Sequence, residues 1–512
     1  MDIARHVYII SDLHIGGTYP DPKATVWERR RGFRMMTRVE ELAKFIRLLA
    51  ALPDSPPVEL IINGDFIDFL AEEKGAGTDE IDADEAPTWS AFRAGKGEAL
   101  AAFREVVKRD RILFAALGEL LGKGKRLTIL LGNHDIELCL PDVQAELIAE
   151  LSPGDLHLVC DGQALDLGEV LVDHGNVFDP ANVVDHDRLR VVRALYSRGW
   201  FKAIEEAFEP PAGSRLVADV MNPIKTEYGF IDLLKPESEP LFALLLAIEP
   251  GYRDALESAA RALKGAAATF LPRWGVSYDL RNVADAGSGA ERATLSEVAD
   301  AGEQAAEESA LDELVAALVV DEAVAASLRT AGREQEAVAQ EVAGGVWRAR
   351  WSLLRLLTGD ETGDLDSRIG QLQATLRVLL TDTSFDRGTE SKRYLDAARL
   401  LSEGGPGRKS YRAVVFGHTH HAKDILIEET GARYFNTGTW ANLMQFPSEL
   451  TDGASTHEEA RDILTEFANN VQKNTLDTYL KFEPTYLRLD LGAEGELIAA
   501  DLRTYDWVKN AL

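Results

Sequence analysis

The sequence is poor in cysteine, with only Cys139 and Cys160 among 512 residues. A single pair is not a disulfide framework, and its spacing matches no thiolate metal site. Cys139 lies between two leucines and Cys160 follows Leu158 and Val159, so we expect two buried free thiols. Free thiols fit a reducing compartment, and we predict a cytoplasmic protein.

Long hydrophobic runs are also missing. The longest apolar block, residues 241–248, is far shorter than the roughly 20 residues that span a bilayer. The apolar run near residue 10 is short and leads straight into Asp12 and His14, so we expect no signal peptide. The sequence therefore predicts no transmembrane segment, while a peripheral membrane contact stays open.

Basic residues are few, with 55 Lys+Arg against 85 Asp+Glu and a net charge of −30. Broad binding to nucleic acid depends on Lys and Arg that neutralise phosphates, so this charge argues against a nucleic-acid partner. The hydrophobic fraction of 46% and charged fraction of 27% are typical of a globular protein. At this length we expect two or three structural units.

Strand and helix signals alternate in residues 1–187, nearly all strand signals vanish in residues 188–402, and strands return in residues 403–512. The predicted strands are residues 7–11, 59–63, 126–131, 156–160, 169–173, 411–416, 424–428, 432–436, 486–491 and 497–502. Helical patterns inside the middle region include residues 291–306, 308–331 and 335–357. We therefore predict an α/β core formed by residues 1–187 and 403–512, with residues 188–402 as an inserted helical domain.

Five polar clusters directly follow predicted strands. They are Asp12-Leu13-His14, Gly64-Asp65-Phe66-Ile67-Asp68, Gly132-Asn133-His134-Asp135, His174-Gly175-Asn176 and Gly417-His418-Thr419-His420. Polar groups at the carboxyl ends of strands in an α/β protein converge on one crevice. Since alternate residues of an extended chain share a side, Asp12 can join His14, and His418 can join His420. Imidazole and carboxylate ligands suit Zn²⁺, Mn²⁺ or Fe rather than Ca²⁺.

Each cluster taken alone has an ordinary structural explanation. An isolated D-x-H is usually a loop accident, and a lone His174 is usually a hydrogen-bonded core histidine. The argument for a metal site depends on their conjunction, because five of the ten histidines fall in these clusters, each at a predicted strand end.

The order D-x-H, G-D-x-x-D, G-N-H-D, H and G-H-x-H resembles the calcineurin-like metallophosphoesterase superfamily over residues 5–187 and 410–505. The resemblance implies an α/β (α+β) fold: a four-layer α/β/β/α sandwich, here with a large inserted all-helical domain. It implies a binuclear centre in which Asp12, His14 and His420 hold one metal, Asn133, His174 and His418 hold the other, and Asp65 bridges both. It also implies that His134 stabilises or protonates the leaving oxygen and that Asp135 orients His134.

The same resemblance implies two divalent cations, Mn²⁺ with Fe or Zn²⁺ as alternatives, and attack on phosphorus by a hydroxide held between them. The expected substrate is a phosphate-containing small molecule: a phosphomonoester, phosphodiester or pyrophosphate of a nucleotide or nucleotide-linked compound. A nuclease is one alternative. A scaffold whose helical insert recruits another protein is the other, and the sequence identifies no such partner.

A more distant similarity links the chain to UDP-2,3-diacylglucosamine pyrophosphatases, which share S-D-L-H and an N-T-G-[ST]-W strand. The chain departs from them in its length, in its larger insert and in His134, where we expect an arginine in those enzymes. We therefore do not assign that substrate.

Several residues around these motifs carry secondary expectations. We expect Asp68 to support the site by hydrogen bonding, with metal binding as the alternative, and Asn436 either to shape the site or to form a plain turn. The three arginines of the segment after His174 either meet substrate phosphates or lie on the solvated surface; they are Arg188, Arg190 and Arg193. Residues 241–248 are expected to form a buried helix core, with an acyl pocket as the alternative. The insert is placed to act as a lid.

Overall fold

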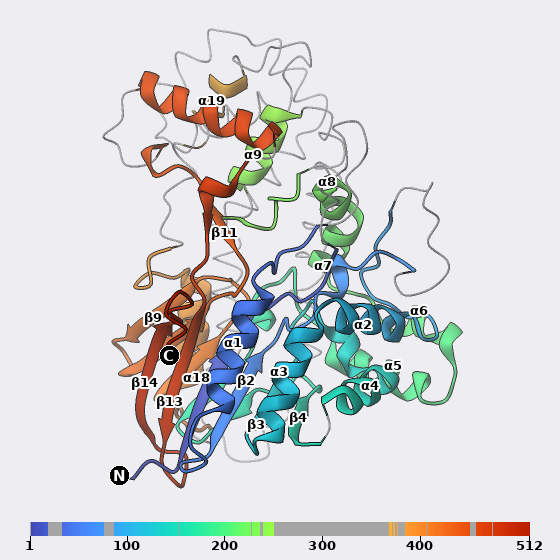
Figure 1. Ribbon diagram of the computed structural model, residues 1–512, viewed down its shortest axis with the longest axis vertical. Coiled ribbons are helices and arrows are strands. Elements are labelled where there is room, and N and C mark those ends of the chain that lie inside the picture. Colours follow the sequence, from blue (N-terminus) through green and yellow to red (C-terminus); the bar gives the residue numbers. More distant parts are fainter. Residues whose placement is uncertain are drawn as a thin grey trace.

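The computed structural model describes residues 2–18, 33–75, 87–151, 153–226, 228–235, 239–249, 368–370, 372, 373, 376, 385–405, 407–450, 457–473 and 475–512 (Figure 1). It is an α/β structure with mixed sheets of six and five strands and a small sheet of three. The helices predicted at residues 291–306, 308–331 and 335–357 lie outside the described residues.

The six-stranded sheet has the order β14-β13-β1-β2-β3-β4. Four of its strands are parallel neighbours: β1 (Arg5–Ile10), β2 (Val58–Asn63), β3 (Arg126–Leu130) and β4 (Asp155–Val159). Strand β13 (Thr485–Leu491) pairs antiparallel with β1, and β14 (Leu497–Thr504) pairs antiparallel with β13. Both ends of the sequence thus contribute to one sheet.

The five-stranded sheet has the order β5-β6-β8-β10-β9. Its parallel centre consists of β6 (Val170–Val172), β8 (Ala413–Phe416) and β10 (Ala432–Thr437). The antiparallel edges are β5 (Leu165–Asp166) and β9 (Ala422–Ile427). Because β6 and β8 are neighbours, residues before 188 and after 403 meet in this sheet as well.

Apolar side chains of the two sheets share one buried cluster, which includes Val7 and Ile61 from the six-stranded sheet and Val172 and Val415 from the other. The opposite face of the six-stranded sheet packs against α1 (Val39–Ala50), α2 (Glu98–Arg109), α3 (Arg111–Gly122) and α4 (Pro141–Leu151). Helix α18 (Lys392–Glu403) packs on the five-stranded sheet. These helices are amphipathic; α1, for example, buries Leu42, Phe45 and Leu49 at helical spacing.

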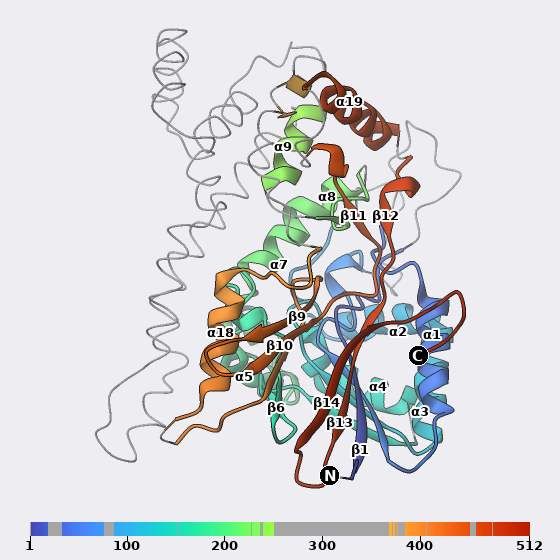
Figure 2. The same ribbon diagram turned by 90° about the vertical axis from the view of Figure 1, so that its left-hand side faces the viewer.

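A second core forms beyond the carboxyl ends of the parallel strands (Figures 1 and 2). It combines α8 (Asn222–Lys225), β7 (Leu234–Lys235) and α9 (Glu239–Ile248) with β11 (Leu443–Gln445), α19 (His457–Lys473) and β12 (Leu480–Lys481). The three short strands pair in the order β12-β11-β7. Residues 443–481, which the sequence analysis assigned to the α/β core, therefore share apolar contacts with residues from the middle of the chain.

Helix α9 contains the apolar block at residues 241–248, and its side chains from Ala243 to Ile248 are buried in the second core. This confirms the expectation of a buried helix core for that block. Helix α5 (His186–Tyr196) carries the three arginines considered for phosphate contact. On it, Arg190 pairs with Asp187 and Arg193 pairs with Asp161, so these two serve surface ion pairs.

The remaining elements are short. They are η1 (Phe69–Ala71), η2 (Ile136–Cys139), η3 (Asn176–Phe178), η4 (Phe201–Ala203), α6 (Ile204–Ala207), α7 (Ala212–Leu216), η5 (Val217–Met221), η7 (Ser448–Leu450) and η8 (Asp477–Tyr479). Among the described residues, none of the helices combines the length and apolar character that crossing a bilayer requires. Cys139 and Cys160 are buried free thiols, as expected, and burial raises the pKa of Cys160 to about 11.

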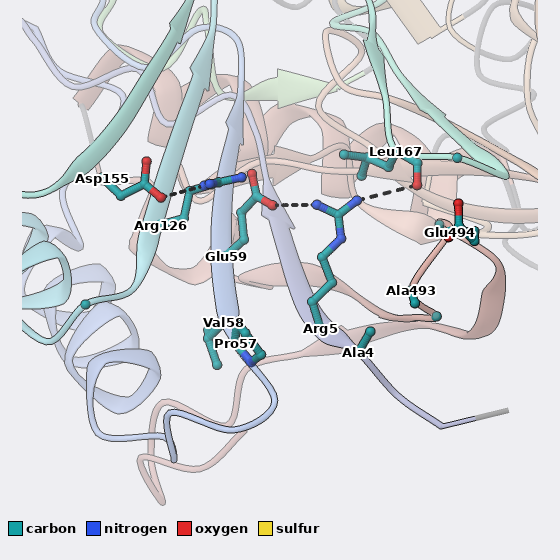
Figure 3. A pocket seen from close by; sticks show the side chains of 14 residues that line it. Ala4, Arg5, Pro57, Val58, Glu59, Arg126, Asp155, Leu167, Ala493 and Glu494 are labelled. Atoms are coloured by element: carbon teal, nitrogen blue, oxygen red, sulfur yellow. Dashed lines mark hydrogen bonds and ion pairs between the residues drawn. The ribbon is translucent and has the colours of Figure 1, made fainter.

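At the amino ends of the parallel strands, away from the predicted motifs, lies a cavity of about 580 Å³ (Figure 3). Four of its five charged side chains form ion pairs: Arg5 lies 3.4 Å from Glu59, and Arg126 lies 2.8 Å from Asp155. Among the described residues, this end of the sheets has no cluster of acids and histidines comparable to that at the opposite end.

Candidate metal centre

The five predicted clusters all follow strands whose carboxyl ends face the same side of the molecule. Asp12 and His14 follow β1, Asp65 follows β2, and Asn133 follows β3, while His174 comes after β6 and the two remaining histidines come after β8. Parallel strands bring their carboxyl ends to one edge of a sheet, and the two sheets pack face to face. The loops therefore meet although their sequence positions span more than 400 residues.

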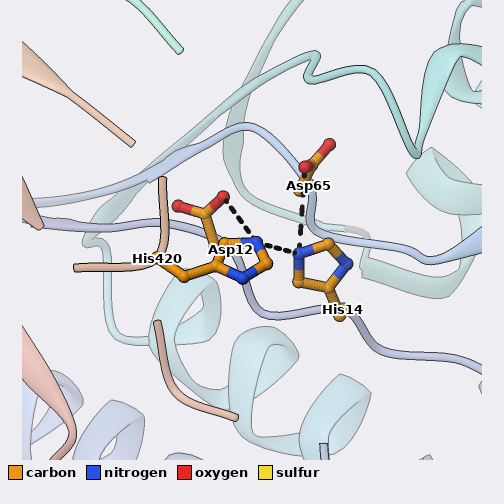
Figure 4. Close-up of side chains that lie close together, drawn as sticks. All are labelled: Asp12, His14, Asp65 and His420. Carbon is orange, nitrogen blue, oxygen red and sulfur yellow. Dashed lines mark hydrogen bonds and ion pairs between the residues drawn. The ribbon is translucent and has the colours of Figure 1, made fainter. Parts of the chain in front are cut away.

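Six of the seven predicted ligands fall into two groups that share Asp65. The first group is Asp12, His14, Asp65 and His420, whose side chains converge in Figure 4; the second is Asp65, His174 and His418. Within each group the candidate ligand atoms all lie within 4.8 Å of one another. Buried His/Asp groups able to hold metal are thus present at the strand ends.

In the first group, the Nε2 atoms of His14 and His420 lie 2.9 Å apart. Two nitrogens that share a cation at about 2.1 Å are expected roughly 3.0–3.4 Å apart, so this spacing is close to that of a shared cation. His420 Nε2 is 3.6 Å from Asp12 Oδ1, and His14 Nε2 is 3.8 Å from Asp65 Oδ2.

In the second group, His174 Nε2 lies 3.3 Å from Asp65 Oδ2. The other ring nitrogen, Nδ1, lies 2.8 Å from the carbonyl oxygen of Asn63, which accepts its hydrogen. When the ring is neutral, as a metal ligand must be, Nε2 therefore carries no hydrogen. The predicted seventh ligand, Asn133, is buried beside this group, and its amide nitrogen lies 3.4 Å from Asn182 Oδ1.

Backbone strain is concentrated at the predicted ligands. Six described non-glycine residues have positive φ, and five of them are predicted ligands: Asp12 (52°), His14 (45°), Asp65 (49°), His418 (68°) and His420 (64°). Non-glycine residues rarely adopt this conformation, and it persists where surrounding structure enforces it, often at functional sites. Only Asn510 adopts it elsewhere in the described chain.

Glycines let the loops approach closely at two points. A Cβ on Gly132 would lie 2.1 Å from Asp65 Oδ1, and a Cβ on Gly64, which has φ of 80°, would lie 2.3 Å from His174 Nδ1. Any larger residue would displace Asp65 or His174. Steric exclusion therefore explains why the G-D and G-N-H motifs have glycine at these two positions.

Asp68, rather than Asp135, holds His134. Asp68 Oδ1 lies 3.1 Å from His134 Nδ1, and its Oδ2 lies 3.6 Å from His14 Nδ1. Asp135 instead accepts hydrogen bonds from the backbone amides of Phe66 (2.8 Å) and Gly132 (2.7 Å). The expected contact by which Asp135 would orient His134 is therefore corrected: Asp135 ties two motif loops together, and Asp68 gives the hydrogen-bonding support expected of it.

The buried charged groups shift one another's pKa values strongly. Burial alone would raise the pKa of Asp65, but the neighbouring histidines, His174 first, outweigh it and hold that pKa well below its usual range. Burial lowers the pKa of His174, but the Asp65 charge raises it to about 10. Burial likewise lowers the pKa of His134, and Asp68 raises it to about 9. Protons on these rings compensate the charge of the buried carboxylates.

No protein-family model matches this chain, and neither the curated proteins nor the solved structures include a significant match.

A buried amide oxygen supports a cation as the occupant of the second group. Asn133 Oδ1 is buried and makes no hydrogen bond with described residues. A buried polar atom without a partner costs free energy, and an amide oxygen can bind a divalent metal ion. The residues present therefore fit a metal centre.

Three supporting features were not predicted from the sequence. Asp179, just beyond the His174 motif, lies 3.1 Å from His418 Nε2 and 2.7 Å from the Asn182 amide nitrogen. The hydroxyl of Ser11 donates to the side chain of Asp12, and the hydroxyl of Thr439 donates to its backbone carbonyl. A lone acid and two hydroxyls have no distinctive spacing, so only their proximity to the motifs could have indicated them.

Asn436 shapes the site rather than merely forming a turn. Its side-chain amide donates to the carbonyl of Gly417 at 2.6 Å and to the hydroxyl of Thr419 at 3.0 Å, and its Oδ1 accepts from the amide of Gly438. Asn436 thus fixes the β8 loop that carries the last two predicted ligands.

Proposed function

We propose that the chain is a metallophosphoesterase of the calcineurin-like type, with two divalent cations, Mn²⁺ first and Fe or Zn²⁺ as alternatives. One cation would be bound by Asp12, His14 and His420, the other by Asn133, His174 and His418, and Asp65 would contact both. The proposed fold is the four-layer α/β/β/α sandwich formed by residues 1–187 and 403–512, with residues 188–402 inserted. The proposed substrate is a phosphate-containing small molecule.

The observation that carries this proposal is the pair of His/Asp groups sharing Asp65. Structural ion pairs alone would not need a buried amide oxygen without a hydrogen-bond partner beside them, as Asn133 Oδ1 is among the described residues. The strained ligand backbones add support, because strain of this kind has to be offset by something that the site gains.

When bound, the two cations would neutralise phosphate charge and activate a water molecule. The side chains supply the rest. His134, with its pKa raised to about 9, carries a proton at neutral pH and would donate it to the leaving oxygen. Asp68 keeps that proton on the ring, and Asp135 fixes the loops that position Asp65 against His134.

The second core supports the proposal of a substrate-selecting lid. It lies on the carboxyl side of the strands, as Figures 1 and 2 show, and it contacts the site loops directly. The Asn222 amide of α8 donates to the carbonyl of Leu70 at 2.7 Å, within the short helix that Asp68 begins. A change in the second core can therefore reach Asp68 and His134.

The test is hydrolysis of bis-p-nitrophenyl phosphate by the full chain with Mn²⁺. We expect wild-type turnover, and losses on the order of 100-fold or more for Asp65→Asn and His134→Ala. Matched controls are Asp155→Asn and His157→Ala on the exposed end of β4, which should keep wild-type rates.

Folding of each variant is checked by circular dichroism and its metal content by elemental analysis. Wild-type rates in both site variants would remove the site assignment. Metal binding without turnover of any phosphate ester would leave a metal protein of another kind, such as the partner-recruiting scaffold.

A further inference from the structure

Helix α18 brings an arginine to the His418 side of the metal centre. Tyr394, in its first turn, lies 6.5 Å from the His418 ring and 6.4 Å from Phe416, both measured between ring centroids. Phe178, from the segment just before Asp179, packs against the same apolar cluster. The start of α18 is therefore adjacent to the Asp179–His418 pair, and Arg393 is the residue before Tyr394.

The segment that leads into α18 is held by contacts with the five-stranded sheet. Tyr434 of β10 donates its hydroxyl to Glu390, 3.1 Å away, and Lys423 of β9 donates to the carbonyl of Asp386 at 2.8 Å. The amide of Asp424 donates to the carbonyl of Arg387 at 2.9 Å. Arg393 is thus carried by a segment anchored on two strands.

Arg393 has no hydrogen-bond or ion-pair partner among the residues that the structure describes, although the chain carries a net charge of −30. The acid three residues later, Asp396, lies 3.9 Å from Arg399, and Glu390 accepts from Tyr434. Arg393 is only partly exposed. A half-buried guanidinium without an acid beside a polar site is suited to an anion from outside the chain.

The charge of Arg393 reaches the site electrostatically. Burial would raise the pKa of Asp179, but the hydrogen bond and charge of His418 lower it to about 2, and Arg393 contributes to the lowering. For Tyr394, burial raises the pKa and Arg393 opposes the rise. Arg393 is therefore near the Asp179–His418 pair while making no ion pair within 4.0 Å of a described carboxylate.

We infer that Arg393 is a substrate-binding residue whose guanidinium contacts oxygens of the substrate phosphate at the His418 end of the metal centre. The inference rests on the proposed function, because it takes the ligand to be a phosphate held by the same site. A planar guanidinium offers two parallel N–H donors that match two phosphate oxygens, which a lysine cannot do. Arg393 would thus take the role that the sequence analysis considered for the arginines of α5.

The test measures inorganic phosphate binding to the Mn²⁺-loaded full chain by isothermal titration calorimetry, and separately its competitive inhibition of bis-p-nitrophenyl phosphate hydrolysis. Arg393→Gln should weaken phosphate about 10- to 100-fold, the usual effect of losing a charge-assisted hydrogen bond. Arg393→Lys should fall between that variant and wild type. KM should rise more than kcat falls, because the contact already exists in the bound ground state.

The matched control is Arg399→Gln on the same helix. Arg399 pairs with Glu403 at 2.6 Å, so its loss should leave phosphate binding and Mn²⁺ content unchanged. Equal phosphate affinity in Arg393→Gln and wild type would overturn the inference. Loss of Mn²⁺ in Arg393→Gln would also overturn it, since Arg393 would then act on the metal centre.

The two proposals fail in different ways. If the wild type binds phosphate but hydrolyses no phosphate ester, the proposed function is wrong, and the role of Arg393 in anion binding is judged by calorimetry alone. If the Mn²⁺-loaded wild type neither binds phosphate nor hydrolyses the ester, both are wrong. If it hydrolyses the ester and Arg393→Gln matches Arg399→Gln, only the inference about Arg393 fails.

Discussion

Individual residues in the site are set by neighbours of opposite charge. Asp68 shows this most directly, because its two carboxylate oxygens approach the Nδ1 atoms of both His134 and His14. A carboxylate in that position fixes the ring orientation and leaves each Nε2 facing the centre of the site. The sequence predicted this supporting role, but it attributed control of His134 to Asp135, whose side chain is occupied by two backbone amides.

Asp68→Asn is expected to shift the pH dependence of hydrolysis. Burial lowers the pKa of His134 and the Asp68 charge raises it to about 9, so His134 keeps its proton below that pH and loses it above. Bound cations lower this value further, and the descending limb of kcat/KM is therefore expected at or below pH 9. Removing the Asp68 charge should move the limb to lower pH by about one unit or more.

The measurement is a pH–rate profile of Asp68→Asn against wild type, with Asp155→Asn as the control at the opposite end of the sheets. An unmoved descending limb, at unchanged metal content, would mean that His134 is not the titrating acid.

At the scale of elements, the predictable parts were those with local signals. Each ligand cluster follows a segment in which apolar residues alternate with polar ones or run together, and such a segment is a local signal for a strand. Strands β1, β2, β3, β6 and β8 and the convergence of their loops could therefore be predicted from the sequence. The arrangement of residues 443–481 could not be predicted in this way. Strands β11 and β12 have three and two residues, too few to show a period, and α19 has an apolar face whose partners lie some 200 residues earlier. Nothing local specifies such a partner.

Phe467→Ala tests whether the second core is a separate structural unit. Phe467 is fully buried, and its ring lies 5.5 Å from Phe446 and 4.9 Å from Tyr479 between centroids. Its removal should cost about 3–5 kcal/mol of local stability. Hydrogen exchange should accelerate in α9, β11 and α19 while β1 and β2 stay protected. Equal acceleration in β1 and β2 would show that both cores unfold together.

At the scale of the whole molecule, stability and cation binding depend on the same buried charges. His174 shows the direction in which stability depends on pH. Burial lowers its pKa, but the Asp65 charge raises it from 6.5 to about 10 in the cation-free fold. Protonated His174 therefore stabilises that fold fully below pH 6.5, and this contribution is lost as the pH rises through 10. Cations compete with this proton, so their affinity should increase over the same range.

Chelation with EDTA should therefore abolish hydrolysis, and Mn²⁺ should restore it. A cation at 100 times its Kd stabilises the fold by about 2.7 kcal/mol, so Tm should fall by roughly 5 °C when it is removed. Calorimetry in buffers of different ionisation enthalpy should show release of about one proton or more on Mn²⁺ binding at pH 8. Full activity in excess EDTA with no metal detected, or a buffer-independent enthalpy, would contradict the metal centre.

The pairing of β1 with β13 has a consequence for how the chain emerges from the ribosome. His6 and Asp490 lie opposite each other across the two strands but 484 residues apart in sequence. At about 5–20 residues per second, translation separates the two strands by roughly 25–100 s. Throughout that interval β1 lacks its neighbour and presents unpaired N–H and C=O groups, so the nascent protein carries an open strand edge that β13 covers only near the end of synthesis.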